Sequence, residues 1–392
     1  MSIATLTDFN GIRNTVPARQ IGPGDLAAAV NVDVNDAKRL VRRDGFTAFD
    51  DSAAADSLFR HGNIVLFRRS NAIRRLLPSA ASEVVVASVT NPVVFWGEEN
   101  RIYWTDGLRN GVIEDGAGKA WGITPPASLP TYAERVTGSL PRGRYLFALT
   151  YVRDGLESGT GRSGQTTELQ GGIDFANLPT ASGIDEKRLY LSRPDGTKLY
   201  LAAVLAPGAT TASYTGDTTT LTIELETQFL QPPPAGACLA VHNGCALVGV
   251  GEFLLFSKPY RHDLFDPVRM SYRFDAPIRM LAPVQGGVFV GTDNEIAYLG
   301  GDDIAAAARD VKAGYGVIPG TLAYTEGHHI GEGMAGRAAL AASTRGVCLL
   351  GDGGQFRNLT LDRYVMPAGV TGAGVVRLEE GKNRYIAVVR GL

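Results

Sequence analysis

Hydrophobic and polar residues alternate with a period of two along much of this chain. In one such segment the large side chains fall on a single face of an extended strand: Tyr145, Phe147, Leu149 and Tyr151. Similar runs of about four to eight residues recur between turn residues, for example in 82–90. The pattern predicts many short β-strands.

The stretch RIYWTDGLRNGVI, residues 101–113, indicates how these strands reverse. Asp106-Gly107 and Asn110-Gly111 supply residues that tolerate the positive φ of tight hairpin turns. We expect a strand, a sharp turn and a second strand beginning at Val112. Trp104 is expected to pack between neighbouring sheets, so the stretch is predicted to be architectural.

Helical patterning is confined to two short stretches. The run DDIAAAARDV predicts a helix over 302–311, with Asp302 or Asp303 as its N-cap. A second short helix is expected over 25–30, with Asp25 as its N-cap. The remainder of the chain is expected to be β-structure and turns.

Two proline clusters divide the chain, TPPASLP at 124–130 and QPPPAG at 231–236. Between them lie six or seven strand patterns in about a hundred residues, which is typical of a β-sandwich. We predict that residues 131–231 form an inserted sandwich domain. Residues 1–130 then hold an N-terminal lead and the first part of the other domain, and 232–392 hold its remainder.

The β patterns on both sides of the insert share one scheme of strand, Gly-rich turn, second strand and polar return. The unit spans about 40 residues, which is near the size of a propeller blade. The predicted fold is therefore all-β: an irregular β-propeller of about five to seven blades with an inserted β-sandwich. The last strand, 384–392, is expected to close the ring by pairing near the N-terminal lead.

Composition narrows the function classes. The 392 residues include 48 Gly and 20 Pro, and the formal net charge of −2 argues against a protein that coats nucleic acid. The three cysteines are too few for a disulfide framework and lie in apolar contexts, which fits a reducing cytoplasm. No signal-peptide pattern and no apolar run of about 18 residues occurs, so no membrane insertion is expected.

Three motifs that resemble chemical sites are assigned no chemistry. GTGRSG at 159–164 matches G-x-G-x-x-G, but a strand-like segment follows instead of a helix, so a loop is predicted. His328, His329 and Glu332 resemble metal ligands, although adjacent strand residues point to opposite faces. The nearest approach to a sialidase Asp-box, 192–200, lies in the predicted sandwich. We expect no catalytic, cofactor-binding or metal-binding residues and no enzyme activity.

Pairs of arginines recur in the first β units. In a strand, one member of each pair must face away from the core. Such charges either protect strand edges from pairing with other chains or contact phosphate. Under the second interpretation, four residues are candidates for contacts to DNA in a channel: Arg68, Arg69, Arg74 and Arg75.

The stretch FNGIRNTVPARQIGPGDLAAAVNVDVNDAKRLVRRDGF, residues 9–46, resembles the N-terminal part of bacteriophage tail proteins of the hub, nozzle or DNA-stabilisation kind. In that group a Gly-Ile-x-Asn lead precedes A-x-N-V-D-V and L-x-R-R-x-G. Residues 103–123 and 256–267 also look like segments of the group. Residues 145–159 are similar to a fibronectin type III or immunoglobulin-like strand pair. Nozzle proteins of this type are often much longer, which is a departure in size.

The resemblance implies a structural role and carries over no catalytic residue. It implies a homo-oligomeric ring, with six subunits expected, placed below the portal and adaptor of a short tail. Such a ring would retain the genome and conduct DNA without sequence specificity during ejection, in a virion assembled in the host cytoplasm. The alternative from the residues alone is a β-propeller binding module that recognises a host-surface glycan or protein.

Overall fold

The computed structural model of the protein describes residues 8–35, 37–43, 54–79, 81–329, 336–360, 363–367, 369–379 and 382–390. Over these residues the regular structure consists of β-strands and five short 3₁₀ turns. The turns are η1 (Ala18–Gln20), η2 (Thr218–Thr220), η3 (Ile304–Ala306), η4 (Gly327–His329) and η5 (Asp352–Gly354). None of the described segments forms a helix that could span a membrane.

Two four-stranded antiparallel sheets precede the insert, each with its strands paired in chain order. The first blade consists of β5 (Ala55–His61), β6 (Ile64–Arg69), β7 (Ala72–Leu76) and β8 (Ser82–Ala87). The second blade consists of β9 (Val94–Glu98), β10 (Arg101–Thr105), β11 (Asn110–Glu114) and β12 (Ala117–Lys119).

Three more sheets and a hairpin follow the insert. The third blade consists of β21 (Cys238–His242), β22 (Cys245–Val250), β23 (Phe253–Lys258), β24 (Arg261–Phe265) and β25 (Ser271–Arg273). The fourth consists of β26 (Ile278–Val284), β27 (Gly287–Thr292), β28 (Ile296–Gly300) and β29 (Ala308–Ala313). The fifth consists of β30 (Ala323–Glu326), β31 (Arg337–Ser343), β32 (Gly346–Leu350) and β33 (Phe356–Asn358). The terminal hairpin pairs β34 (Thr371–Glu379) with β35 (Lys382–Arg390).

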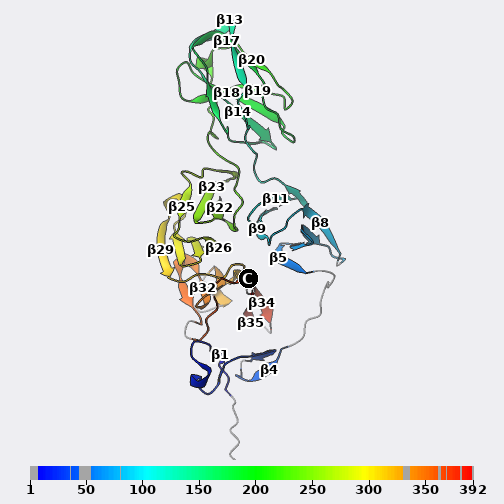
Figure 1. The fold of residues 1–392 in the computed structure, drawn as a ribbon, viewed down its shortest axis with the longest axis vertical. Coiled ribbons are helices and arrows are strands. Elements are labelled where there is room, and N and C mark those ends of the chain that lie inside the picture. Colours follow the sequence, from blue (N-terminus) through cyan, green and yellow to red (C-terminus); the bar gives the residue numbers. More distant parts are fainter. Residues whose placement is uncertain are drawn as a thin grey trace, which may run out of the picture.

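The five blades and the hairpin are arranged around a common centre (Figure 1). Buried apolar clusters lie between consecutive sheets, and one of them joins the third and fourth blades through Leu247, Leu254, Val288 and Leu299. Each blade thereby covers a face of the next, which removes apolar area from water and leaves only short strand edges exposed. The fold is an all-β propeller that carries an inserted β-sandwich.

Trp104 packs between the first two blades, as predicted, beside Leu66 and Ile73 of the first blade. The turn before β11 differs from the prediction, because Thr105 pairs with Asn110 and the second strand begins there rather than at Val112. Gly111 lies opposite Trp104, and a Cβ at Gly111 would lie 2.5 Å from the indole nitrogen. The glycine is therefore needed for ring packing and not for a turn.

The predicted helix over 302–311 is wrong. The Asp303 carboxylate accepts a hydrogen bond from the Ala305 amide at 2.9 Å and caps only the short turn η3. From Ala308 the chain pairs with β28 as the outer strand β29. The sheet edge supplies hydrogen bonds along this ladder, and these outweigh the helix preference of alanine.

The predicted helix over 25–30 is also wrong. Asp25 belongs to β2 (Asp25–Leu26), which pairs in parallel with β1 (Gly11–Ile12). Its carboxylate forms ion pairs with Arg13 and Arg363, so it anchors the lead instead of capping a helix. The lead also contains the hairpin of β3 (Val32–Val34) and β4 (Leu40–Arg42).

The chain ends meet through a different contact from the predicted one. The Asn14 side chain donates a hydrogen bond to the Val365 carbonyl at 2.8 Å and accepts one from the Val365 amide at 2.8 Å. The described part of the last strand pairs with β34. The lead thus contacts the segment before the terminal hairpin, and not the last strand by backbone pairing.

The insert contains two packed sheets that project away from the propeller (Figure 1). One sheet consists of β13 (Thr131–Gly143), β17 (Leu169–Ala176) and β20 (Ala212–Tyr214). The other consists of β14 (Leu146–Arg153), β15 (Leu156–Glu157), β16 (Ser163–Gln165), β18 (Glu186–Ser192) and β19 (Leu199–Leu205). Their inner faces enclose a shared core that includes Tyr145, Phe147, Ile173 and Phe175. The boundary at 131–231 remains a prediction about independent folding.

Candidate functional site

The four candidate arginines all lie on the β6–β7 hairpin of the first blade. Ser70 and Asn71 form its turn, both with positive φ (52° and 56°). Because neighbouring strand residues point to opposite faces, the hairpin separates the members of each arginine pair. The structure thus brings the four side chains together on one hairpin but sends them to two different faces.

Arg68 and Arg75 lie on the face that packs against the second blade. Arg68 is in register with Ile73, which belongs to the buried cluster around Trp104. The guanidinium of Arg68 donates a hydrogen bond to Asp56 at 2.8 Å and another to the Thr90 carbonyl at 3.0 Å. These contacts give Arg68 a structural role within its own blade.

Arg75 also has a structural role. Its guanidinium forms an ion pair with Glu83 of β8. The same group lies against the β11–β12 turn, where a Cβ on Gly116 would come within 2.7 Å of Arg75 Nη1. Arg75 therefore ties the first blade to the second.

Arg69 and Arg74 lie on the opposite face of the hairpin. Arg69 Nη2 donates to the Ser82 hydroxyl at 3.1 Å, and Arg74 Nε donates to the same oxygen at 3.0 Å. Arg74 Nη2 also lies 3.4 Å from the Ser82 carbonyl oxygen. The Arg69 guanidinium is 5.5 Å from the centre of the Phe67 ring. The half-buried guanidinium groups of Arg69 and Arg74 thus both donate to the Ser82 hydroxyl. We call these three residues the arginine fork.

Sequence reasoning found these arginines but missed Ser82. The four cations were visible as adjacent pairs, whereas the partition into two faces depends on register. The β6–β7 pairing is regular, and a β-bulge at Val85 shifts the pairing of β8 with β7, which places Ser82 on the face of Arg74. The only available signal was the alternation of residues along β6.

An aromatic contact joins the second and fifth blades, which are not consecutive in the chain. The rings of Trp96 on β9 and Tyr324 on β30 are 6.2 Å apart, edge to face. The Arg337 guanidinium lies 3.6 Å from the centre of the Tyr324 ring and 5.6 Å from that of Trp96. Burial raises the pKa of the Tyr324 hydroxyl. These three side chains pack together across two blades that are not neighbours in the sequence.

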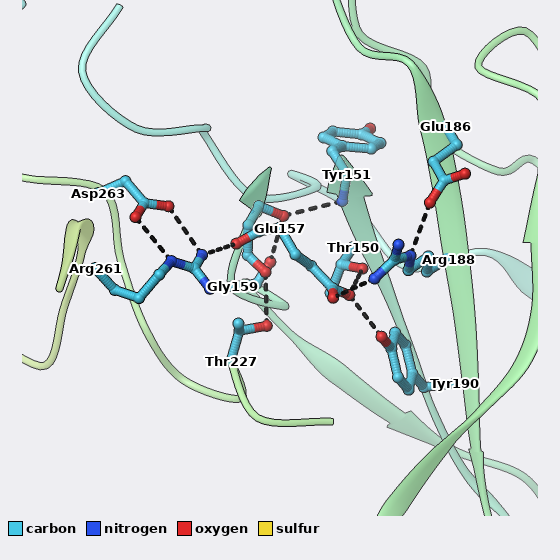
Figure 2. A network of polar contacts seen from close by, with 11 residues as sticks. Thr150, Tyr151, Glu157, Gly159, Glu186, Arg188, Tyr190, Thr227, Arg261 and Asp263 are labelled. Carbon is cyan, nitrogen blue, oxygen red and sulfur yellow. Dashed lines mark hydrogen bonds and ion pairs between the residues drawn. The ribbon is translucent and has the colours of Figure 1, made fainter. Parts of the chain in front are cut away.

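A polar network joins the sandwich to the third blade (Figure 2). The Glu157 carboxylate accepts hydrogen bonds from Thr150 at 2.5 Å, Tyr190 at 2.6 Å and Arg188 at 2.9 Å. Burial, and then the Glu157 carboxylate, raise the pKa of the Tyr190 hydroxyl. Arg261 of β24 donates to the Glu157 carbonyl at 3.2 Å.

The same junction is held by further contacts across the two connecting segments. Asp263 holds the Arg261 guanidinium through two hydrogen bonds of 3.0 Å. Arg153 Nη2 donates to the Gly122 carbonyl at 2.8 Å. Lys258 Nζ donates to the Glu226 carbonyl at 3.0 Å. Hydrogen bonds therefore reach both connecting segments and join the sandwich to the third blade.

The glycines of GTGRSG belong to this junction. A Cβ at position 159 would come within 1.9 Å of the Leu230 carbonyl, and one at Gly161 within 2.7 Å of the Pro126 carbonyl. Strand β16 follows, as the sequence indicated, and no helix begins there. These glycines allow close backbone packing.

The structure describes only part of the cluster of His328, His329 and Glu332. His328 lies in the turn η4, while Glu332 lies outside the described residues. Over the described part of the chain, no group of three or more His, Cys, Asp or Glu side chains has the arrangement of a metal site. The three cysteines are free and buried.

The sandwich carries a shallow hollow of about 400 Å³ on its three-stranded sheet. At its centre the Asp174 carboxylate accepts a hydrogen bond from Ser213 at 2.5 Å and pairs with Arg135 at 3.1 Å. The Ser213 hydroxyl and then Arg135 hold the pKa of Asp174 below its usual value. Small residues surround this triad, among them Ala133 and Ala176. The hollow is open to solvent, and Arg135, Asp174 and Ser213 are among its lining residues.

No family model matches this chain, and no curated protein matches it. Among solved structures, BBS1N in complex with ARL6DN aligns at 12% identity over 88% of this chain and 91% of that chain, with a TM-score of 0.34. The Neurospora crassa Pan2 WD40 domain aligns at 7% identity over 86% of both chains, with a TM-score of 0.34. The N-terminal domain of Nup159 aligns at 9% identity over 85% and 72%, with a TM-score of 0.30. Because these TM-scores are low, the propeller assignment rests on the strand pairings described above.

Proposed function

We propose that this chain is a structural subunit of a bacteriophage tail, a hub or nozzle component below the portal and adaptor. It forms a homo-oligomeric ring, six-fold in our proposal, that retains and conducts DNA during genome ejection without reading its sequence. It has no enzymatic role in this proposal, and it assembles into the virion in the host cytoplasm.

The observation that carries this proposal is the tied junction between sandwich and propeller. Arg153, Lys258 and Arg261 each cross it with a hydrogen bond of 3.2 Å or less. A subunit that must hold a ring against the pressure of packaged DNA benefits from domains that cannot swing. The aromatic contact of Trp96 and Tyr324 fits the same role, because it joins two blades that are not consecutive and so stiffens the propeller.

The test is the loss of the gene product from otherwise complete particles. Particles without this protein should lose their packaged DNA or fail to eject it, and electron microscopy should show a missing ring below the portal. Restoring the protein from a plasmid should restore both. Particles that keep their genome and infect normally would reject the proposal.

A second function, recognition of a host-surface glycan or protein, is favoured by the hollow around Asp174. Its base presents a carboxylate and a guanidinium in hydrogen-bond contact, a common arrangement for polar ligands. A glycan array probed with the full chain tests it, with Asp174→Ala as the variant and Glu224→Ala as a control on the same domain. Binding that the Asp174 change abolishes would favour this function over the tail ring.

A further inference from the structure

We propose that the outer edge of β35 is a docking site for an extended peptide segment of another protein, which adds to the terminal hairpin as a further antiparallel strand. The segment has alternating β-branched residues and an acidic residue at its N-terminal end. This inference goes beyond the proposed function and does not depend on it, because such a partner could bind a tail subunit or a surface-recognition module.

The backbone of β35 has one paired edge and one outer edge. Gly372 and Gly374 of β34 donate hydrogen bonds to the carbonyls of residues 319 and 320, at 2.9 and 3.2 Å, so the even-numbered residues of β34 point away from β35. The odd-numbered residues of β34 therefore bond to their register partners in β35, which are even-numbered. The backbone groups at the outer edge of β35 then belong to Asn383, Tyr385, Ala387 and Val389.

This outer edge is open within the part of the chain that the structure describes. No backbone hydrogen bond between described segments reaches it. N–H and C=O groups that alternate along an extended strand match the groups of another extended strand, which is how peptides add to exposed sheet edges. The blades contain four or five strands, whereas the described sheet of β34 and β35 contains two. The geometry thus selects a strand as the occupant and leaves room for it.

The edge of β35 lacks the charges that protect another outer strand of the propeller. β29 is the outer strand of the fourth blade, and Arg309, Asp310 and Lys312 interrupt its sequence. Charges of this kind discourage pairing with other chains. In β35, residues 385–389 carry no charge. The comparison indicates an edge that accepts a partner strand.

Apolar side chains beside the edge favour β-branched residues in the partner. Val375, Ile386 and Val388 lie on the exposed face of the hairpin, at 53%, 36% and 54% exposure. Tyr385 and Val389 point the opposite way, toward the fifth blade. Because an added strand sets its side chains directly beside those of β35, valines opposite Ile386 and Val388 would cover part of the exposed apolar area.

The charge of the hairpin favours another protein over a second copy of this chain. Residues 371–390 contain four cations and two carboxylates, a net charge of four minus two, or +2: Arg377, Lys382, Arg384 and Arg390, with Glu379 and Glu380. Two copies paired at this edge would bring like charges together. Arg390 is exposed at the end of β35, where an acidic residue opposite it would form a cross-strand ion pair. In antiparallel pairing, this acid lies at the N-terminal end of the partner segment.

The experiment measures binding of the full chain to a fluorescently labelled peptide, Glu-Thr-Val-Thr-Val-Thr, by anisotropy. In the proposed register its residues lie opposite 390 to 385, with the Glu beside Arg390 and the valines beside Val388 and Ile386. One control peptide has Lys in place of the Glu. The other has Pro in place of the second Thr, which removes an N–H directed at β35.

The test variant of the protein is Ala387→Pro, which removes one N–H from the outer edge and leaves the ladder to β34 intact. The matched control is Val311→Pro on β29, an exposed position whose backbone also points away from its sheet, because its register partner Ala297 bonds to β27. Arg390→Gln tests the charge match. Circular dichroism melting of each variant verifies folding, and the Pro peptide tests the same hydrogen bonding on the unaltered protein.

Wild type is expected to bind the Glu peptide best. The Pro peptide should bind roughly tenfold more weakly, because a hydrogen bond of the added strand is lost. The Lys peptide should bind about threefold more weakly, because a cross-strand ion pair becomes a repulsion. Ala387→Pro should weaken binding of the Glu peptide roughly tenfold, and Val311→Pro should leave it unchanged. Arg390→Gln should remove the difference between the Glu and Lys peptides and keep the effect of the Pro peptide.

Equal binding of the Glu and Pro peptides by wild type would overturn the strand pairing, and absence of binding would overturn the site. An equal loss in Val311→Pro would overturn the assignment to β35, and a preference for Glu that survives Arg390→Gln would overturn the charge match. Sedimentation that shows wild-type dimers broken by Ala387→Pro, without peptide binding, would assign the edge to a second copy and reject the proposal. If the peptide binds as expected but particles without the protein still infect, the docking edge stands and the tail function fails.

Discussion

The propeller and the sandwich bury their strands in different ways. In the propeller, β27 belongs to the fourth blade, which has a neighbouring blade on each face, and all six residues of β27 are buried. In the sandwich, β17 buries Ile173 and Phe175 against the core, while Asp174 between them belongs to the exposed hollow. A strand such as β27 with both faces covered has a continuous apolar sequence, whereas a strand such as β17 with one face covered alternates apolar and polar residues.

The same comparison explains the ends of the ring. The terminal hairpin packs Tyr385 and Val389 toward the fifth blade. Its other face exposes Val375 and Val388, at 53% and 54%. The first blade likewise covers Leu66 but directs the arginine fork away from the second blade. Ring ends resemble sandwich strands, because each has one covered face.

The largest effect expected is the separation of the two regions. Residues 131–231 expressed alone should fold, because the sandwich core is formed from its own two sheets with few contributions from outside. Amide proton dispersion in a two-dimensional NMR spectrum is the measurement. A spectrum with collapsed dispersion would mean that the sandwich depends on the propeller.

Core truncations should affect the two regions separately. Phe289→Ala between the fourth and fifth blades and Phe175→Ala in the sandwich should each cost about 3–5 kcal/mol of local stability. All three tryptophans, Trp96, Trp104 and Trp121, lie outside 131–231, so their fluorescence follows the propeller only. In urea, Phe289→Ala should shift the fluorescence transition, and Phe175→Ala should leave it nearly unchanged. Equal shifts would show that the regions unfold as one unit.

Loss of the Glu157 carboxylate should have a smaller effect, and this effect should be confined to the sandwich, because the contact to Arg261 uses the Glu157 backbone carbonyl. Glu157→Ala removes the acceptor of Thr150, Tyr190 and Arg188 and should cost about 2–3 kcal/mol, because the buried donors lose their partner. Differential scanning calorimetry measures it. Glu224→Ala, which removes the exposed pair with Lys198, is the control and should change stability much less. Equal costs would contradict a structural role for the network.

The smallest effect expected is the contribution of Tyr145 to the pH dependence of sandwich stability. Burial raises the pKa of the Tyr145 hydroxyl from its ordinary value of 10.0 to about 12. Since the folded state holds this proton more tightly, the stability contribution is complete below pH 10 and is lost as pH rises toward 12. Tyr145→Phe should reduce that alkaline loss, measured by circular dichroism melting of the fragment at several pH values. An unchanged pH profile would count against the raised pKa.

The sequence by itself determined the presence and the spacing of most strands. Period-two alternation located the strand β14, but the expectation of one buried face was wrong, because residues 147–152 are all buried and the strand is covered on both faces. The same logic placed Trp104 between two sheets, since a large apolar ring on a strand has to be covered. These properties depend on neighbours a few residues away, which the sequence shows.

Only the tertiary structure decided the features that depend on distant partners. The alanine-rich run after Asp303 became β29 because the edge of β28 was available to it. Gly111 is needed on β11 because the Trp104 ring of the neighbouring strand β10 occupies the space that a side chain would take. The register of the β6–β7 hairpin places Arg68 and Arg75 on one face and Arg69 and Arg74 on the other. Arg68 and Arg75 then form ion pairs with carboxylates on β5 and β8. Pairing between strands is set by the summed fit of many contacts, and no local stretch of sequence contains that sum.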